Sequence, residues 1–184
     1  MVRRRRRAIT LAALALVAGC RSRPGAADVG LLVERLKSPD RESSGQASLD
    51  IIRLGEPAAA ALGEMLADPE PRLRETAART LWGMGAKGKG AVPALAVALK
   101  DSEVSVRTTS AMALENMGPA AASAVSALTS ALQDPDGQVR HWAARALGGI
   151  GPAARSALPE LKRAARVDGV REPAEEAIRK ISGQ

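Results

Sequence analysis

A pair consisting of an apolar residue followed by glycine recurs along the chain at nearly constant spacing. The glycines are Gly55, Gly85, Gly118 and Gly151, which lie 30, 33 and 33 residues apart, and Gly183 closes a fifth stretch. Self-similarity with a period of about 20–50 residues indicates stacked supersecondary units, none of which can bury its apolar face alone. The chain is therefore predicted to be an array of five similar units.

Each unit contains two sets of residues with the spacing of a helix face. The first is a pair four positions apart: Leu32/Leu36, Leu62/Leu66, Leu95/Leu99, Leu128/Leu132 and Leu161/Ala165. The second combines a small residue with an apolar one: Ala47/Ile51, Ala77/Leu81, Ser110/Leu114, Ala143/Leu147 and Ala174/Ile178. Residues four apart share one side of a helix, so two short helices per unit are predicted. The small positions let helices approach closely, so a core without Phe or Tyr can pack.

The composition excludes several other classes of protein. Trp82 and Trp142 are the only aromatic residues, which argues against β-sandwiches, β-barrels and modules that stack nucleic-acid bases on aromatic rings. The net charge of +7 would favour an anionic partner. However, Arg3–Arg7 supply five of the 27 basic residues, and the 22 that remain face 20 acidic ones. The main body is nearly neutral, and no nucleic-acid partner is predicted.

The turn between the two helices of a unit also repeats. It contains an aspartate that is followed two residues later by an acid and six residues later by an arginine, as in Asp68/Arg74, Asp101/Arg107 and Asp134/Arg140. Aspartate is a favoured N-cap, and acids stabilise the first turn of a helix. Each aspartate is therefore expected to cap the second helix of its unit.

This pattern resembles the HEAT repeat, and most closely the short PBS-lyase HEAT-like subtype, over residues 28–184. The resemblance implies an all-α fold, a right-handed α-solenoid of about five HEAT-like two-helix repeats, with units at about 28–55, 56–85, 86–118, 119–151 and 152–184. It also implies a polar ladder between neighbouring repeats, formed here by Asp68, Arg74, Asp101, Arg107, Asp134 and Arg140. Ser38 and Ser44 occupy the ladder positions of the first unit, as expected of a capping repeat without an outer neighbour.

The N-terminal residues have the pattern of an export signal. Arg3–Arg7 precede a mostly apolar stretch, Ala8–Gly19, which is too short to span a bilayer and has the length of a signal-peptide core. The following Cys20 completes a sequence, Val-Ala-Gly-Cys, that resembles the lipobox of bacterial lipoproteins. The resemblance implies a signal peptide at 1–19, lipidation of Cys20 and a short linker over 20–27.

The resemblance implies that the protein is located in the cell envelope. Arg21 follows the cysteine where an aspartate would mark a different sorting route, and by resemblance this favours the periplasmic face of the outer membrane. The lipid would be the protein's contact with the membrane. The alternative is an uncleaved helix that contains an ordinary buried cysteine at position 20.

Few residues could carry catalysis or bind a metal. The segment Gly83–Gly90 approaches the phosphate-loop pattern, but Gly90 replaces the required hydroxyl residue and a helix precedes it, so a loop between repeats is predicted. His141 is the only histidine and Cys20 the only cysteine, which leaves too few ligands for a zinc site. No cofactor, metal or catalytic residue is predicted, and the chain is not expected to be an enzyme.

The second helices of HEAT-like units line the concave side of the solenoid. A stripe on these helices changes identity from unit to unit, through Glu75, Arg79 and Trp82, then Thr108, Met112 and Glu115, then His141, Arg145 and Gly148, then Glu172, Glu176 and Arg179. Trp and Arg are enriched at binding hot spots, and solenoids offer extended concave surfaces. Within the stripe, six residues are predicted to contact a partner: Glu75, Arg79, Trp82, Met112, His141 and Arg145. A solvated helix face is the plainer interpretation.

The sequence thus favours a non-catalytic scaffold at the cell envelope. It would bind a protein or peptide through the concave face of the solenoid, while a lipid on Cys20 holds it at the membrane. Three alternatives stay open: a structural or self-associating envelope module, an enzyme component similar to bilin lyases, and a carrier of a small ligand.

Overall fold

A computed structural model describes residues 26–167 and 169–183. Over this part of the chain there are ten α-helices, four 3₁₀-helices and no strand. The first helices of the successive units are α1 (Ala26–Leu36), α3 (Ala59–Met65), α5 (Val92–Ala98), α7 (Val125–Ala131) and α9 (Leu158–Ala164). The second helices are α2 (Arg41–Leu54), α4 (Pro71–Met84), α6 (Val104–Met117), α8 (Gly137–Ile150) and α10 (Arg171–Ser182). The all-α solenoid predicted from the sequence is confirmed.

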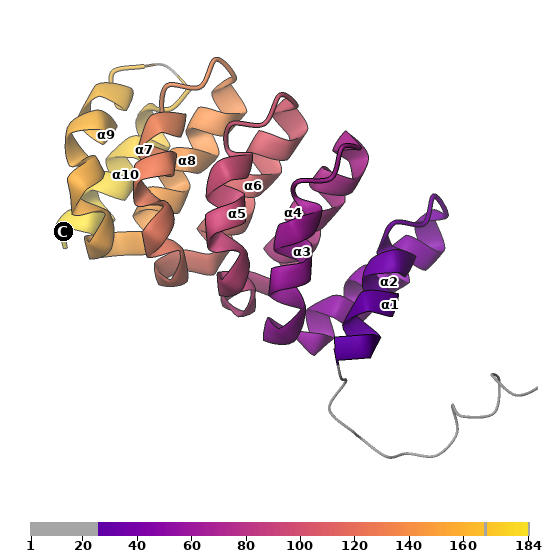
Figure 1. The fold of residues 1–184 in the computed structure, drawn as a ribbon. Coiled ribbons are helices and arrows are strands. Elements are labelled where there is room, and N and C mark those ends of the chain that lie inside the picture. The colour runs from indigo at the N-terminus through magenta and orange to yellow at the C-terminus, as the bar shows by residue number, and fades with distance from the viewer. Residues whose placement is uncertain (1–25, 168, 184) are drawn as a thin grey trace, which may run out of the picture.

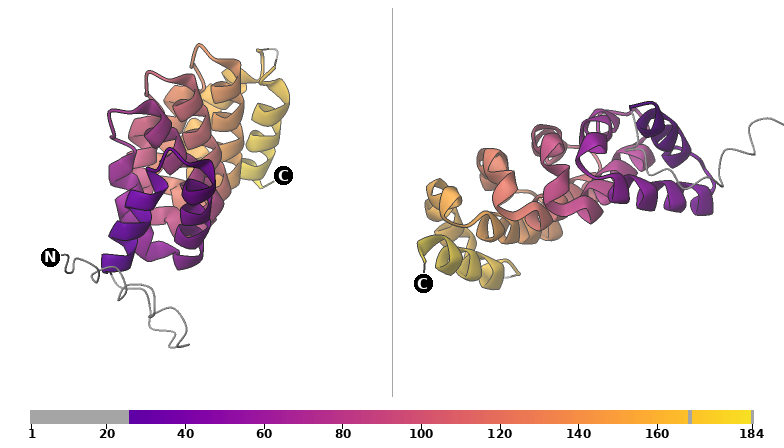
Figure 2. Two further views of the ribbon diagram at one scale, coloured as in Figure 1. Left: turned by 90° about the vertical axis from the view of Figure 1, so that its right-hand side faces the viewer. Right: turned by 90° about the horizontal axis from the view of Figure 1, so that it is seen from below.

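The helices form two layers that curve together along the array (Figures 1 and 2). The second helices pack directly on one another, α4 on α6, α6 on α8 and α8 on α10, whereas the shorter first helices make few contacts among themselves. The layer with the closer neighbours lies on the inner side of the curve, as the right-hand view of Figure 2 shows. The second helices therefore line the concave surface. None of the helices described is long and apolar enough to cross a membrane.

A glycine with positive φ ends each second helix. Gly85 (φ 52°) and Gly118 (φ 56°) show why, because their backbone N–H groups turn back to the carbonyls of Trp82 and Glu115 in a conformation that L-side chains rarely adopt. Asn116 donates a further hydrogen bond (2.7 Å) from its side chain to the Trp82 carbonyl and so joins the ends of α4 and α6.

Short 3₁₀-helices connect one unit to the next: η1 (Glu56–Ala58), η2 (Gly85–Ala91), η3 (Gly118–Ala124) and η4 (Gly151–Ala157). The segment that approaches the phosphate-loop pattern falls largely within η2. Gly88 is buried there, and a Cβ atom at this position would lie 2.7 Å from Cε of Met117. Gly88 thus serves close packing between units two and three.

The repeated apolar positions form one continuous core. Leu62, Leu95, Leu128 and Leu161 of the first helices are fully buried, as are Leu81, Leu114 and Leu147 of the second. The small positions are fully buried too, and at one of them the Ser110 hydroxyl has no hydrogen-bond partner. In the last unit Ile178 is only partly buried, whereas Ile181 is fully buried.

The expectation that Asp68, Asp101 and Asp134 cap the second helices is wrong. The N-caps are Glu70, Glu103 and Asp136, two residues further on. Each of the three aspartates instead closes the preceding turn, because its carboxylate accepts the backbone N–H two residues ahead at 2.9 Å. This turn aims the carboxylate sideways along the array.

Candidate functional site

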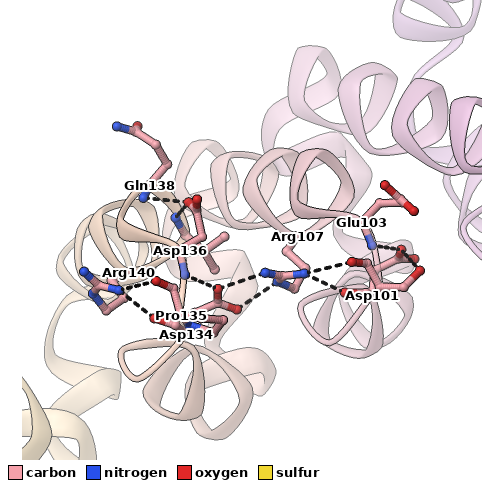
Figure 3. Close-up of polar contacts among 10 residues, drawn as sticks. Asp101, Glu103, Arg107, Asp134, Pro135, Asp136, Gln138 and Arg140 are labelled. Atoms are coloured by element: carbon pink, nitrogen blue, oxygen red, sulfur yellow. Dashed lines mark hydrogen bonds and ion pairs between the residues drawn. The ribbon is translucent and has the colours of Figure 1, made fainter.

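A ladder of arginines and aspartates joins the central units (Figure 3). Arg74 donates two parallel hydrogen bonds to the carboxylate of Asp101, at 2.7 and 2.8 Å. Arg107 does the same to Asp134, at 2.8 and 3.0 Å. These side chains are only about one-tenth exposed, and bidentate pairing of a guanidinium with a carboxylate is among the strong hydrogen-bonding arrangements. The ladder therefore ties the second unit to the third and the third to the fourth.

The remaining nitrogen of each guanidinium explains the six-residue spacing. Nη1 of Arg107 donates to the backbone carbonyls of Asp101 and Ser102, at 2.9 and 3.2 Å, within its own unit. The same pattern holds for Arg74, and Nη1 of Arg140 donates to Asp134 and Pro135 at 2.7 and 2.9 Å. Arg74 and Arg107 thus each close the turn of their own unit and bind the turn of the next, whereas Arg140, within the part of the chain that the structure describes, closes only its own turn.

The ladder stops at both ends of the array. Ser44 stands where the first unit would need an arginine, and its hydroxyl donates to the Leu36 carbonyl (2.8 Å) instead of reaching Asp68. At the other end, Arg140 has no carboxylate partner within the described residues, and its buried Nε has no hydrogen-bond partner. Among the described residues, the ladder thus joins the second, third and fourth units only.

Hydrogen bonding from Arg74 lowers the pKa of Asp101, and burial opposes this only in part. A carboxyl whose pKa is lower in the folded protein contributes stability above the unfolded value, about 3.9, and loses it as the pH falls toward the folded value. We therefore expect the free energy of unfolding to decline below about pH 4, and to decline less steeply in Asp101→Asn. Urea titrations from pH 7 to pH 3 test this, and parallel profiles for the two proteins would contradict it.

Ion pairs order several side chains of the stripe that the second helices present on the concave surface. Arg79 pairs with Glu75 on α4, and Arg145 of α8 reaches Glu115 of α6 at 3.0 Å. Trp82 is 43% exposed and stands on the same face of α4 as Arg79. The predicted contact residues are thus brought to one surface, and three of them, Glu75, Arg79 and Arg145, are already engaged in ion pairs.

A second cluster on α8 surrounds Trp142. Its ring packs partly into the core, with the His141 ring edge-on at 5.5 Å and the Arg145 guanidinium 5.0 Å from the ring centre. Such a cation–π contact contributes about 0.5–1 kcal/mol at an exposed site. It fixes the direction in which Arg145 points. Met112, on α6, is half-buried on the same layer.

Gly148 does not belong to the exposed stripe, contrary to expectation. It is buried, and a Cβ atom there would lie 3.0 Å from the Cα atom of Ala177 on α10. The last turns of α8 approach α10 too closely for any side chain at this position. Glu176 pairs with Lys180 on α10 at 2.6 Å, and this contact lowers the pKa of Glu176.

The described residues hold no group of three His, Cys, Asp or Glu side chains that could bind a metal. Cys20, the predicted lipidation site, and the signal pattern before it lie outside the described residues. The structure also contains a feature that the sequence analysis missed, a groove between α2 and α4 that Arg41 and Arg72 line. Ser38 and Ser44 at ladder positions were the signal that could have located it.

Stacked two-helix units with a buried polar ladder define the class of this protein as an α-solenoid of helical repeats. The chain belongs to the HEAT repeat family, whose model, described as HEAT repeats, matches residues 59–125 and 92–179. No curated protein matches the sequence.

Solved structures share this fold at low sequence identity. The complex of CpcE and CpcF of phycocyanin lyase from Nostoc sp. PCC7120 matches with a TM-score of 0.67 and 23% identity, over 83% of this chain and 99% of that chain. A designed armadillo repeat protein in complex with the peptide (KR)4 matches with a TM-score of 0.64 and 18% identity, over 84% of this chain and 82% of that chain. At these identities the likeness shows the fold alone.

Proposed function

We propose that this HEAT-repeat protein is a non-catalytic scaffold that binds a protein or peptide through its concave face. The observation that carries the proposal is the row of differing side chains on α4, α6 and α8, which includes the exposed Trp82 and the oriented Arg145. Buried columns repeat from unit to unit, whereas this surface does not, so it is free to match a particular partner. A designed armadillo repeat protein of similar fold holds a peptide, which supports the proposal.

The ion pairs on this face favour binding at low entropic cost. Arg145 is fixed by Glu115 and by the Trp142 ring before a partner arrives. A side chain that is already ordered loses less conformational freedom on association. Trp82 and Arg145 are therefore expected to contribute most to the affinity, as residues of these two types commonly do at hot spots.

A capture experiment tests the concave face. We expect residues 21–184 to capture a partner from an envelope extract of the host, and the Trp82→Ala, Arg145→Ala variant to lose it while staying folded by circular dichroism. The matched control is Val97→Ala, Arg155→Ala, which removes one exposed apolar residue from α5 and one exposed arginine from η4, both outside the second helices. Equal capture by all three proteins, or none by any, would contradict the proposal.

We further propose that a lipid on Cys20 tethers the scaffold to the cell envelope, at the periplasmic face of the outer membrane. The support is the sequence pattern, in which a basic segment, a short apolar core and a small-residue cleavage site precede the only cysteine of the chain. Two or more acyl chains anchor a protein stably, whereas one holds it only marginally.

Replacing Cys20 tests the anchor. Cys20→Ala is expected to abolish labelling with a palmitate analogue and to change the protein's partition between membrane and soluble fractions. Unchanged membrane association and unchanged mobility on a gel would show that Cys20 carries no lipid.

A further inference from the structure

A groove of about 670 Å³ lies between α2 and α4, where the first unit meets the second. It falls within the range of about 300–1,000 Å³ that is typical of ligand sites. Its mouth is lined by Arg41 and Arg72, near the N-terminal ends of the two helices, and Arg79 and Glu75 stand on its α4 side. Figure 1 shows the α1–α2 pair set apart from the following pair on this side of the array.

The groove exists because the first rung of the ladder is missing. At the next interface Arg74 draws the turn before α6 onto α4, whereas at this interface the position is held by Ser44, whose hydroxyl donates to the Leu36 carbonyl of its own unit. The helices still meet at their C-terminal ends, where a Cβ atom on Gly83 would lie 2.6 Å from Cδ1 of Ile52. They diverge from that contact toward their N-terminal ends.

Hydroxyl groups form the floor of the groove. Ser48 on α2 and Thr80 on α4 share a hydrogen bond of 3.0 Å across it, and Ser44 and Thr76 lie further toward the mouth. Small polar side chains leave room for an extended peptide backbone and can exchange hydrogen bonds with it. At the central interfaces of the array, the second helices pack more extensively on one another and the ladder joins their turns.

The charge of the groove is positive, and part of it is uncompensated. Three arginines face one glutamate among the lining residues. Arg79 is paired with Glu75, and Arg72 is held by Glu70 and by the carbonyls of Lys37 and Ser38. Arg41 is exposed and has neither an ion pair nor a hydrogen bond from its side chain to any part of the described chain.

We propose that this groove binds an acidic segment of the protein partner, one carboxylate of which pairs with Arg41. Guanidinium groups match carboxylates in geometry, and here they stand at the mouth of a groove that the second helices line. The inference rests on the proposed function, because the acidic segment belongs to the same protein or peptide partner. It would bind to the same layer of second helices, at the end formed by the first unit. A partner rich in Asp or Glu is the chemistry that this charge selects.

Binding of a defined acidic peptide tests the inference. The full chain, purified in detergent, is titrated into a fluorescein-labelled peptide of six glutamates, and fluorescence anisotropy is read at low salt. We expect saturable binding that Arg41→Glu weakens at least about tenfold, because it replaces a charge-assisted contact by repulsion. Arg41→Glu should fold normally, since an acid in the first turn of α2 is favourable.

The matched control is Arg53→Glu. Arg53 lies on the same helix but outside the groove, so this variant makes an equal change in net charge. We expect it to bind the peptide with an affinity within about twofold of the parent. Equal losses for the two variants, equal binding of a peptide of six lysines, or no saturable binding would overturn the inference. Binding to phosphatidylglycerol vesicles that depends on Arg41, without peptide binding, would overturn it in favour of a lipid headgroup.

The outcome is separable from that of the capture experiment. A partner captured through Trp82 and Arg145, combined with no binding of the glutamate peptide, would overturn the groove alone. Peptide binding that depends on Arg41, combined with no captured partner, would contradict the concave-face proposal and leave the groove as an acidic-ligand site.

Discussion

Replacing Arg107 with alanine is expected to lower the free energy of unfolding by about 2–3 kcal/mol, because it leaves a buried carboxylate and two backbone carbonyls without donors. Arg107 is 9% exposed, and its partner Asp134 belongs to the next unit. The loss therefore affects both the turn of the third unit and its junction with the fourth. Urea unfolding followed by circular dichroism measures it.

Arg140→Ala is the matched control for this experiment. Arg140 makes the same two carbonyl bonds in its own turn, but it has no carboxylate partner in the described part of the chain. Its replacement is expected to cost about 1 kcal/mol, and the difference between the two variants measures the ion pair between units. Equal costs would mean that the pair of Arg107 with Asp134 contributes no net stability.

The same substitution, glycine to alanine, is expected to have opposite effects on two second helices. At Gly148 the added methyl would lie 3.0 Å from the α10 backbone at Ala177, so α8 and α10 must separate, at a cost of about 1–3 kcal/mol. At Gly45 on α2 nothing lies within 4 Å of the added methyl, and the helix gains about 0.5–1 kcal/mol from the lower entropy of the unfolded chain.

Thermal and urea unfolding of the two alanine variants, each compared with the parent, measure this contrast. A stabilised Gly148→Ala protein would show that α10 adjusts without cost and that its packing does not set the spacing of the last two units. A destabilised Gly45→Ala protein would show that the wall of the groove at α2 has a requirement for glycine beyond the space around it.

The fold could be predicted because its determinants are local and repeated. The glycines that end each second helix and the leucine pairs of the first helices recur at the same spacing. A helix boundary that is ambiguous in one unit can therefore be placed by comparison with the others. The N-caps were placed wrongly because an aspartate that closes a turn and one that caps a helix have the same local sequence. The hydrogen bond that each carboxylate accepts from the N–H two residues ahead decides between them, and Asp68 accepts it without an arginine from the preceding unit.

The candidate site was predicted less completely than the core. Helical spacing identified the face that carries Arg79 and Arg145, but it could not show that both arginines are engaged in ion pairs. It also placed Gly148 on the surface, because spacing along one helix says nothing of how closely the next helix approaches. The groove at Arg41 depends on the divergence of two helices, and such divergence is a property of the interface between units.

Because no ladder ion pair in the described chain joins the first two units, the first unit is expected to be more weakly coupled to its neighbour than the central units are. In a linear chain of repeats, stability is the sum of each unit's own term and its coupling to its neighbours, and the coupling of α2 to α4 lacks the ion pair that joins the central units. We therefore expect the first unit to open while the four behind it stay folded. Amide protons of α2 should then exchange with solvent sooner than those of α6 and α8. If Cys20 carries a lipid, the least cooperative part of the solenoid is the part that stands next to the membrane.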